Sequence, residues 1–216
     1  MILSVLIPTR GRPDLAVRAA QSVLDHATVG EVEILFRVDS DDLSGLDKLL
    51  AVQDAKVIVG PRYGYAGLNR YYDELAGLAK APWLFLFNDD CVLRGDARLG
   101  KALGTMTVHL GIIRIEDGFD GDEKQVLFPI VPRVLYQILG TLGWHYALDS
   151  YLHALFYQCM RRRPLSIPGL EIVHERATTE EAEKLSAEHR MIWSEPEVQC
   201  AVTFDAKILL LWEGRA

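Results

Sequence analysis

The sequence has no long apolar run, few cysteines and no excess of positive charge. No stretch of 18 or more apolar residues occurs among the 216 residues, so we expect no membrane-spanning helix. The opening segment, Met-Ile-Leu-Ser-Val-Leu-Ile-Pro, lacks a charged leader and a cleavage site, and we interpret it as a first strand. The three cysteines, Cys91, Cys159 and Cys200, form no pair at zinc or redox spacing. A reducing, cytoplasmic compartment is therefore the expectation.

The charge balance argues against a general polyanion-binding protein. Asp and Glu number 30 against 23 Lys and Arg, which gives a formal net charge of -7. Nucleic-acid-binding domains normally carry a basic face instead. The one dense basic run, Arg161-Arg162-Arg163, is typical of the solvated end of a helix. The length suits one sizeable core, so a single domain over residues 1–216 is predicted.

Apolar runs alternate with helix-like stretches, which is typical of an α/β fold with a mostly parallel sheet flanked by helices. In the first half, continuous apolar runs predict strands at residues 3–7, 32–38, 56–59 and 83–87. Helical spacing predicts helices at residues 14–26, 45–52 and 69–79. In the second half we expect helices at 96–107, 149–162 and 179–190, strands at 111–116 and 170–173, a mixed segment at 128–139, and an apolar tail at 198–212 whose type the periodicity leaves open.

Polar residues follow each early strand at the point where it ends. In chain order, the four segments are Pro8-Thr9-Arg10, Asp39-Ser40-Asp41-Asp42, Gly60-Pro61-Arg62 and Asn88-Asp89-Asp90. Ligands of open parallel sheets bind beyond the carboxyl ends of the strands. The pattern therefore predicts a polar ligand site at one edge of the sheet.

Asp89 and Asp90 belong to a very apolar segment, residues 83–93, which we interpret as a buried strand that delivers two carboxylates. Adjacent carboxylates repel each other, which raises the pKa of at least one of them unless a cation intervenes. A hard divalent cation such as Mg²⁺ or Mn²⁺ removes that cost and bridges to phosphate oxygens. The pair therefore predicts a metal–nucleotide site, whereas Asp41-Asp42 favours a turn and a helix cap.

Three motifs in this order resemble the GT-A-fold glycosyltransferases, specifically the large family 2. They are Ser-Val-Leu-Ile-Pro-Thr-Arg, Val-Asp-Ser-Asp-Asp and Phe-Leu-Phe-Asn-Asp-Asp. The resemblance covers residues 1–95 and continues more loosely to His174. It implies a Rossmann-like GT-A fold with a nucleotide-binding half, residues 1–95, and an acceptor-binding half, residues 96–216. It also implies a nucleotide-sugar donor, with Mn²⁺ or Mg²⁺ as cofactor.

Matched position by position, the resemblance implies roles for the strand ends. Asp39 would accept a hydrogen bond from the base N–H, which favours a uridine donor. Asp89 would contact the ribose or a metal-bound water, and Asp90 would ligate the metal. The residues implied to line the nucleoside pocket are Pro8, Thr9 and Arg10. The family's Ala-Arg-Asn-x-Gly reads Gly-Leu-Asn-Arg-Tyr-Tyr here, so no role is carried over to Asn69 or Arg70.

Further along, the family opens a helix with a Glu-Asp pair whose Asp is the catalytic base. Here Leu148 replaces the Glu and Asp149 keeps the carboxylate, so Asp149 is the implied base for an inverting transfer. His174 matches the family's histidine metal ligand after a short strand. Two plainer interpretations stay open, because Asp149 also suits a helix N-cap and a lone histidine is often structural. Trp144 and Tyr146 suit either stacking on an acceptor ring or core packing.

Two rival functions remain open. A nucleotidyltransferase normally carries a Gly-rich loop with a lysine after the first strand, and here only Gly11 lies in that lysine-free stretch. A non-catalytic nucleotide-sugar-binding module is compatible with Leu148 and the short length. The acceptor stays open among glycan, lipid-linked glycan, protein, small molecule and a hydroxymethylated DNA base. The net charge disfavours DNA, and the Arg161–Arg163 run favours it weakly.

Overall fold

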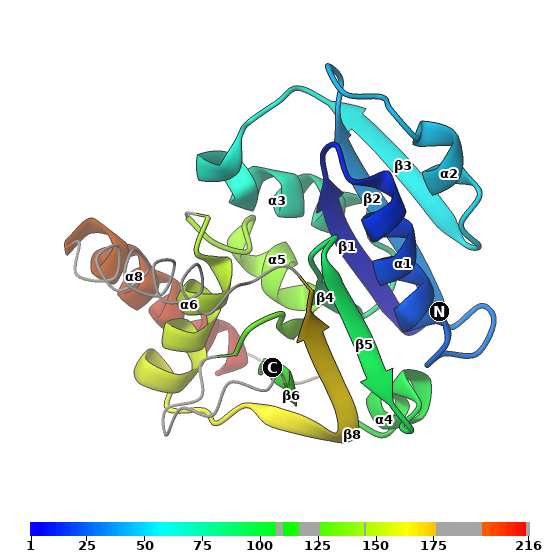
Figure 1. The fold of residues 1–216 in the computed structure, drawn as a ribbon. Coiled ribbons are helices and arrows are strands. Elements are labelled where there is room, and N and C mark those ends of the chain that lie inside the picture. The colour runs from blue at the N-terminus through cyan, green and yellow to red at the C-terminus, as the bar shows by residue number, and fades with distance from the viewer. Residues whose placement is uncertain (107–109, 117–125, 145, 176–195, 215–216) are drawn as a thin grey trace.

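The computed structural model describes residues 1–106, 110–116, 126–144, 146–175 and 196–214 (Figure 1). Within these ranges, eight strands form one sheet in the order β3-β2-β1-β4-β7-β6-β8-β5. Helices cover both of its faces (Figure 1). The predicted α/β class, with a mostly parallel sheet flanked by helices, is confirmed.

The first half of the chain builds a parallel run of four strands. These are β1 (Leu3–Thr9), β2 (Val32–Asp39), β3 (Ala55–Gly60) and β4 (Trp83–Leu86). Leu3 pairs in register with Val32 on one side and with Trp83 on the other. Since all four strands run the same way, their carboxyl ends lie at the same edge of the sheet.

The inner parallel strands are largely apolar on both faces because they separate two hydrophobic clusters. Val5 and Ile7 face the cluster under the first set of helices, whereas Leu6 faces the cluster under the second set. The first set comprises α1 (Pro13–Leu24), α2 (Leu46–Leu50) and α4 (Leu99–Thr105). The second set comprises α3 (Leu68–Leu78), which follows the 3₁₀ turn η1 (Tyr65–Gly67), α5 (Arg133–Leu139), α6 (Leu148–His153) and α8 (Pro196–Glu213).

The second half of the chain extends the sheet with mixed strand directions. It contributes β6 (Ile113–Glu116), β7 (Ile130–Pro132) and β8 (Leu165–His174), which are joined by β5 (Cys91–Gly95). β4 pairs with β7 and β5 pairs with β8, both antiparallel. In Figure 1, β5 and β8 lie side by side. Cys91 is the register partner of His174, so this pairing brings the end of β8 to the start of β5.

The prediction of one strand over residues 83–93 is wrong. The segment forms β4 and β5 with a turn between them, and that turn carries Asn88, Asp89 and Asp90. Both parts are apolar, so local sequence merges them. The antiparallel partner β8 is what makes the second part a separate strand.

The strand predicted at 170–173 is longer than expected, since β8 starts at Leu165 and continues through Pro168 and Gly169. Gly95, with φ of +123°, faces this stretch across the ladder. A Cβ added there would lie 2.1 Å from the carbonyl oxygen of Gly169. Only glycine permits this close backbone approach, which lets β8 pass an irregular point and stay paired.

The helical predictions need smaller corrections. The helix expected at 149–162 is α6 followed by a π-helical turn, η2 (Ala154–Cys159). The helix expected at 96–107 starts at Leu99. The tail at 198–212 is helical throughout. In the basic run, Arg162 pairs with Glu213 of α8 at 2.5 Å, so that arginine ties two elements together. The helix predicted at 179–190 lies outside the described residues.

Candidate functional site

Residues from three strand ends meet at one edge of the sheet. Thr9 ends β1, and its hydroxyl donates to Oδ2 of Asp89 at 2.7 Å. Asp39 ends β2, and Arg10 donates to its Oδ2 at 3.1 Å. Pro8 is half-buried beside them on β1. The structure therefore brings together the predicted pocket residues from β1, from β2 and from the turn after β4.

Asp39 is buried, and its carboxylate has polar neighbours on the protein side. Its Oδ1 lies 3.5 Å from Nη1 of Arg37, and the Tyr71 hydroxyl interacts with the same carboxylate. Within the described part of the chain, this atom accepts no hydrogen bond of normal geometry. Buried carboxylate oxygens normally have a donor. The protein itself covers this oxygen, and the Arg37 guanidinium offsets its charge.

A buried arginine fixes the backbone beneath Asp39. Arg37 is 1% exposed, donates to Glu74 at 2.5 Å and lies 4.9 Å from the ring centroid of Tyr71. A Cβ added at Gly60 would lie 2.5 Å from Nη2 of Arg37, so β3 has to end in glycine at that point. The end of β2 is thus packed from both sides, and the position of Asp39 is well defined.

The pair Asp41-Asp42 closes the loops at this edge. Asp41 pairs with Arg10, and that hydrogen bond lowers the pKa of the Asp41 carboxyl. Asp42 accepts the backbone N–H of Gly11 at 2.5 Å. The predicted turn is present, but the cap on α2 is not, because Gly45 occupies the N-cap position.

Asp89 and Asp90 are bridged by an arginine that the sequence interpretation did not single out. Nη2 of Arg12 lies 2.6 Å from Oδ1 of Asp89, and Nη1 lies 3.0 Å from Oδ2 of Asp90. Burial raises the pKa of Asp89 to about 6, opposed by Thr9 and Arg12. Burial acts in the same direction on Asp90, but His174 and Arg12 outweigh it, so the pKa of Asp90 is lowered. Asp90 is therefore the more readily ionised of the two.

Asp90, Cys91 and His174 form the one group of potential metal ligands among the described residues. Their ligand atoms lie within 4.8 Å of one another, and Nε2 of His174 is 3.2 Å from Oδ1 of Asp90. The ring of Phe128 stacks beside His174. A carboxylate and an imidazole fit Mn²⁺ or Mg²⁺. Burial raises the pKa of the Cys91 thiol far above its usual range, so it stays protonated and is a poor ligand for such an ion.

Asp149 is related to these carboxylates through its electrostatic effect on Tyr72. The hydroxyl of Tyr72 donates to Oδ1 of Asn88 at 3.0 Å. Burial raises the pKa of Tyr72, and Asp89, Asp90 and Asp149 all add to that effect through their charges. The charges of all three carboxylates thus act on one buried phenol, which relates the predicted catalytic residue to the predicted metal residues.

The start of α6 shows what replaces the family's Glu-Asp pair. Leu148 is 4% exposed and packs in the hydrophobic cluster beneath the helix. Ala147 is the N-cap, so Asp149 lies inside the first turn and is not the cap. It accepts the N–H of Ser150 at 2.8 Å and is half-buried. A carboxylate in the first turn of a helix is favoured by the helix dipole.

Hydrogen bonds with uncharged donors anchor the loop before α6 to α3. Asp73 accepts the N–H of Leu142 at 2.7 Å and the hydroxyl of Thr141 at 2.8 Å. Burial raises the pKa of Asp73 to about 6, opposed by these two donors. Asn69 donates to the carbonyl oxygen of Gly143 at 3.1 Å. Asn69, whose role the sequence left open, therefore holds this loop in place.

Two aromatic side chains near this loop, Trp144 and Tyr146, have different neighbours. Trp144 is 57% exposed, and its indole N–H donates to Asp205 of α8 at 2.9 Å. Tyr146 lies against Tyr65, with ring centroids 4.9 Å apart. Trp144 is exposed and Tyr146 is half-buried, so neither is a core residue. Stacking on an acceptor ring therefore fits these side chains better than core packing does.

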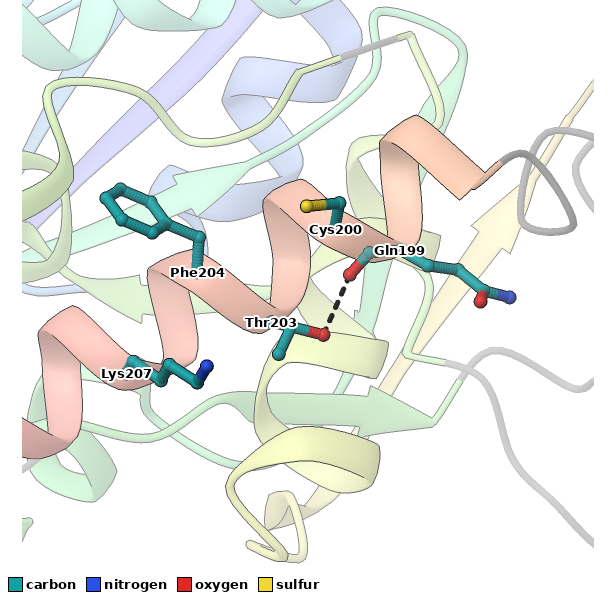
Figure 2. Close-up of a pocket in the computed structure, with 5 residues that line it drawn as sticks. All are labelled: Gln199, Cys200, Thr203, Phe204 and Lys207. Atoms are coloured by element: carbon teal, nitrogen blue, oxygen red, sulfur yellow. Dashed lines mark hydrogen bonds between the residues drawn. The ribbon is translucent and has the colours of Figure 1, made fainter.

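A hollow of about 410 Å³ lies on α8, and its lining comes from that helix alone (Figure 2). The lining residues are Gln199, Cys200, Thr203, Phe204 and Lys207. It shares no residue with the strand-end site. Its single basic group and lack of carboxylates make it a poor candidate for the metal–nucleotide chemistry.

Sequence reasoning missed three polar residues: Arg12 and Arg37, which are held against carboxylates, and Tyr72, which donates to Asn88. Arg12 had a usable signal, since it follows the first strand within Thr9-Arg10-Gly11-Arg12. Arg37 also had one, because a charge inside a largely apolar strand has to be paired. Tyr72 had none, as an aromatic residue on a helix face normally indicates the core.

No family model matches this sequence, and no curated protein matches it significantly. Solved structures do match. TarS residues 1–349 from S. aureus with UDP-GlcNAc gives a TM-score of 0.60 at 12% identity, over 88% of this chain and 66% of that one. A mannosyltransferase from Pyrobaculum calidifontis with GDP-Man and Mn²⁺ also gives 0.60 at 12% identity, over 99% of this chain and 75% of that one. The fold is that of the GT-A glycosyltransferases.

The GT-A fold is shared over different portions of these proteins. A longer TarS structure gives a TM-score of 0.51 at 14% identity, and this chain spans 29% of its length. The chain thus spans less than two thirds of the TarS chains. Among the described helices, none has both the length and the apolar character needed to cross a bilayer.

Proposed function

We propose that this protein is a metal-dependent glycosyltransferase that moves a sugar from a nucleotide-sugar donor, preferably a UDP-sugar, to an acceptor hydroxyl with inversion. One observation carries the proposal. Asp39, Asp89 and Asp90 converge with His174 at the carboxyl ends of the parallel strands, where ligands of such sheets bind. The shared GT-A fold supports it.

The donor base fits beside Asp39. The carboxylate of Asp39 is an acceptor at the end of β2, and the N3–H of uracil is a donor of matching kind. A site built to hydrogen-bond such a group rejects a base that lacks it. This supports uridine as the preferred nucleoside.

The diphosphate fits beside Asp90 and His174, which would hold the cation. Bound there, Mn²⁺ or Mg²⁺ would supply Lewis-acid stabilisation of the departing diphosphate. Asp90 is suited to this role because its pKa is lowered and it stays ionised at neutral pH. Asp89 is tied to Thr9 and acts beside it as an accessory group.

The acceptor fits against the loop before α6 and the first turn of that helix. Asp149 would take the proton of the attacking hydroxyl as general base. The accessible rings of Trp144, Tyr146 and Tyr65 suit stacking with a ring-shaped acceptor. Leu148 fills the core where the family carries a Glu, so Asp149 would act without that neighbour.

A donor panel tests the proposal. UDP- and GDP-sugars are scored for Mn²⁺-dependent hydrolysis and for binding by calorimetry, with EDTA as the metal-free arm. Metal-dependent binding followed by hydrolysis or transfer is the expected result. No nucleotide binding at all would overturn the proposal. Metal-dependent UDP binding with no turnover on any acceptor would favour the binding module instead.

A further inference from the structure

We propose that Arg12 couples metal binding to donor binding: its guanidinium bridges Asp89 and Asp90 when no cation is present, and it contacts the donor diphosphate once a divalent cation binds Asp90. This inference rests on the proposed function. It gives a binding role to a residue in the β1–α1 loop that the motif resemblance leaves without one.

The first step concerns the contacts that the described residues make with the two carboxylates. Thr9 and Arg12 take the two oxygens of Asp89, at 2.7 and 2.6 Å. His174 and Arg12 take the two oxygens of Asp90, at 3.2 and 3.0 Å. Among the described residues, Arg12 is the one that contacts both carboxylates. It therefore supplies the positive charge that lets two adjacent, largely buried aspartates coexist without a cation.

The second step concerns competition for Asp90. A divalent cation held by Asp90 would be a second positively charged group beside the carboxylate that already pairs with Arg12. Two cations this close repel each other strongly, since the side chain of Asp90 is only 12% exposed and solvent screening is weak. Cation binding is therefore expected to weaken the contact between Arg12 and Asp90, and the contact in turn weakens cation binding.

The third step concerns where the guanidinium would go. The side chain of Arg12 is 34% exposed, so it has access to solvent on the ligand side. Arg12 is also the N-cap residue of α1, a 12-residue helix whose first turn points its free N–H groups toward the same edge. A planar guanidinium binds phosphate oxygens through two parallel hydrogen bonds. A diphosphate arriving with the cation would replace the carboxylate that Arg12 gives up.

This exchange predicts an unusual pair of opposite effects in Arg12→Gln. Without nucleotide, the variant should bind Mn²⁺ about tenfold more tightly than wild type, because the competing charge is gone. With Mn²⁺ present, it should bind UDP about tenfold more weakly, because the diphosphate contact is gone. The thermodynamic coupling between Mn²⁺ and UDP should fall accordingly.

The experiment measures Mn²⁺ affinity by the electron paramagnetic resonance signal of the free ion and UDP affinity by calorimetry, on the intact chain. Arg18→Gln is the matched control, because it removes the same charge from α1, where Arg18 pairs with Glu175 next to His174. The control should shift both affinities far less. Circular dichroism checks that each variant is folded. If Arg12→Gln fails to fold, Arg12→Lys keeps the charge but loses the two-pronged bridge, and it should show the same two shifts at about threefold.

The outcomes separate the two proposals. Equal Mn²⁺ affinities in wild type and Arg12→Gln, with Mn²⁺-dependent UDP binding intact, overturn the role of Arg12 and leave the proposed function standing. If Arg18→Gln matches Arg12→Gln in both shifts, general electrostatics explains them and the coupling is overturned. If wild type binds Mn²⁺ but no UDP, the proposed function fails, and the coupling fails with it. Opposite shifts confined to the Arg12 variants support the coupling.

Discussion

The carboxylates at the strand ends and those around α6 are held in opposite ways. At the strand ends, Asp39, Asp89 and Asp90 are paired with arginine or histidine. Around α6, Asp73 is held by a hydroxyl and a backbone N–H, and Asp205 by an indole and a phenol. Cation-paired carboxylates can exchange partners with a metal and a diphosphate. Carboxylates that accept hydrogen bonds from uncharged donors keep a loop in place.

This contrast divides the proposed chemistry between two regions of the molecule. The strand-end site would manage charge, and the region around α6 would position the acceptor and take a proton. Each substitution below is expected to affect the function of one of these regions. An effect on the function of the other region would contradict the comparison.

The largest effect is expected from Asp90→Asn, on the charged side. Loss of the ionised ligand should abolish Mn²⁺-dependent UDP binding and reduce transfer or donor hydrolysis more than about 10³-fold, because the metal contributes several kcal/mol. Calorimetry and a hydrolysis assay measure both quantities. Unchanged activity in the folded variant would exclude Asp90 as the metal ligand.

Asp149→Asn should affect only the chemistry assigned to the region around α6. A general base contributes about 10²–10⁴-fold, so transfer should fall by that factor while UDP binding with Mn²⁺ stays unchanged. Single-turnover transfer and calorimetry separate the two. A loss of donor binding would show that Asp149 supports the structure of the donor site.

Asp73 is one of the carboxylates held by uncharged donors, and its raised pKa predicts that the free energy of unfolding depends on pH. Its folded pKa of about 6 lies above the ordinary value of 3.8, so the folded state holds this proton more tightly than the unfolded chain does. Its contribution is therefore fully present below about pH 4 and is lost as the pH rises through 6, by at most about 3 kcal/mol.

Asp73→Asn should remove this dependence. The unfolding free energy of the variant relative to wild type should increase between pH 4 and 7, as measured by urea denaturation. Asp54→Asn is the control, since Asp54 is exposed and has a positive φ of 57° that asparagine tolerates. Parallel pH profiles for wild type and Asp73→Asn would contradict the prediction.

The smallest effect is expected from Asp39→Asn, which keeps the shape and removes the charge. UDP affinity should fall about tenfold, the value of one hydrogen bond to a charged acceptor, and the preference for UDP over GDP should narrow. Competition calorimetry with both nucleotides measures the ratio. An unchanged ratio would mean that Asp39 does not read the base.

Sequence reasoning predicted the parallel half of the fold well because its signals are local. Apolar strands of four to eight residues, separated by helical spacing, show β1 to β4 directly. β5 was missed because its start is indistinguishable from a continuation of β4. Only pairing with β8, about 80 positions away, separates the two strands, and no local pattern encodes that pairing.

The candidate site divides along the same line. Thr9, Asp39, Asp89 and Asp90 follow apolar strands, so their meeting place could be predicted from the parallel arrangement. The position of Arg12 just after β1 hints at the site, but its bridge to both carboxylates could not be predicted, because a loop arginine between Gly11 and Pro13 also has the local features of a solvated residue. The contact depends on how the loop closes over the strand ends. The functional roles of all these residues stay predictions until variants are measured.

The pairing of Cys91 with His174 has a consequence for folding. Side chains alternate between the faces of a strand, so a one-residue slip between β5 and β8 would turn the imidazole to the opposite face and away from Asp90. The two donors of the proposed cation site lie in segments 84 positions apart in the chain. High-affinity cation binding would then appear only after the last strand has docked in register. During refolding, the appearance of Mn²⁺ affinity would therefore time the completion of the sheet.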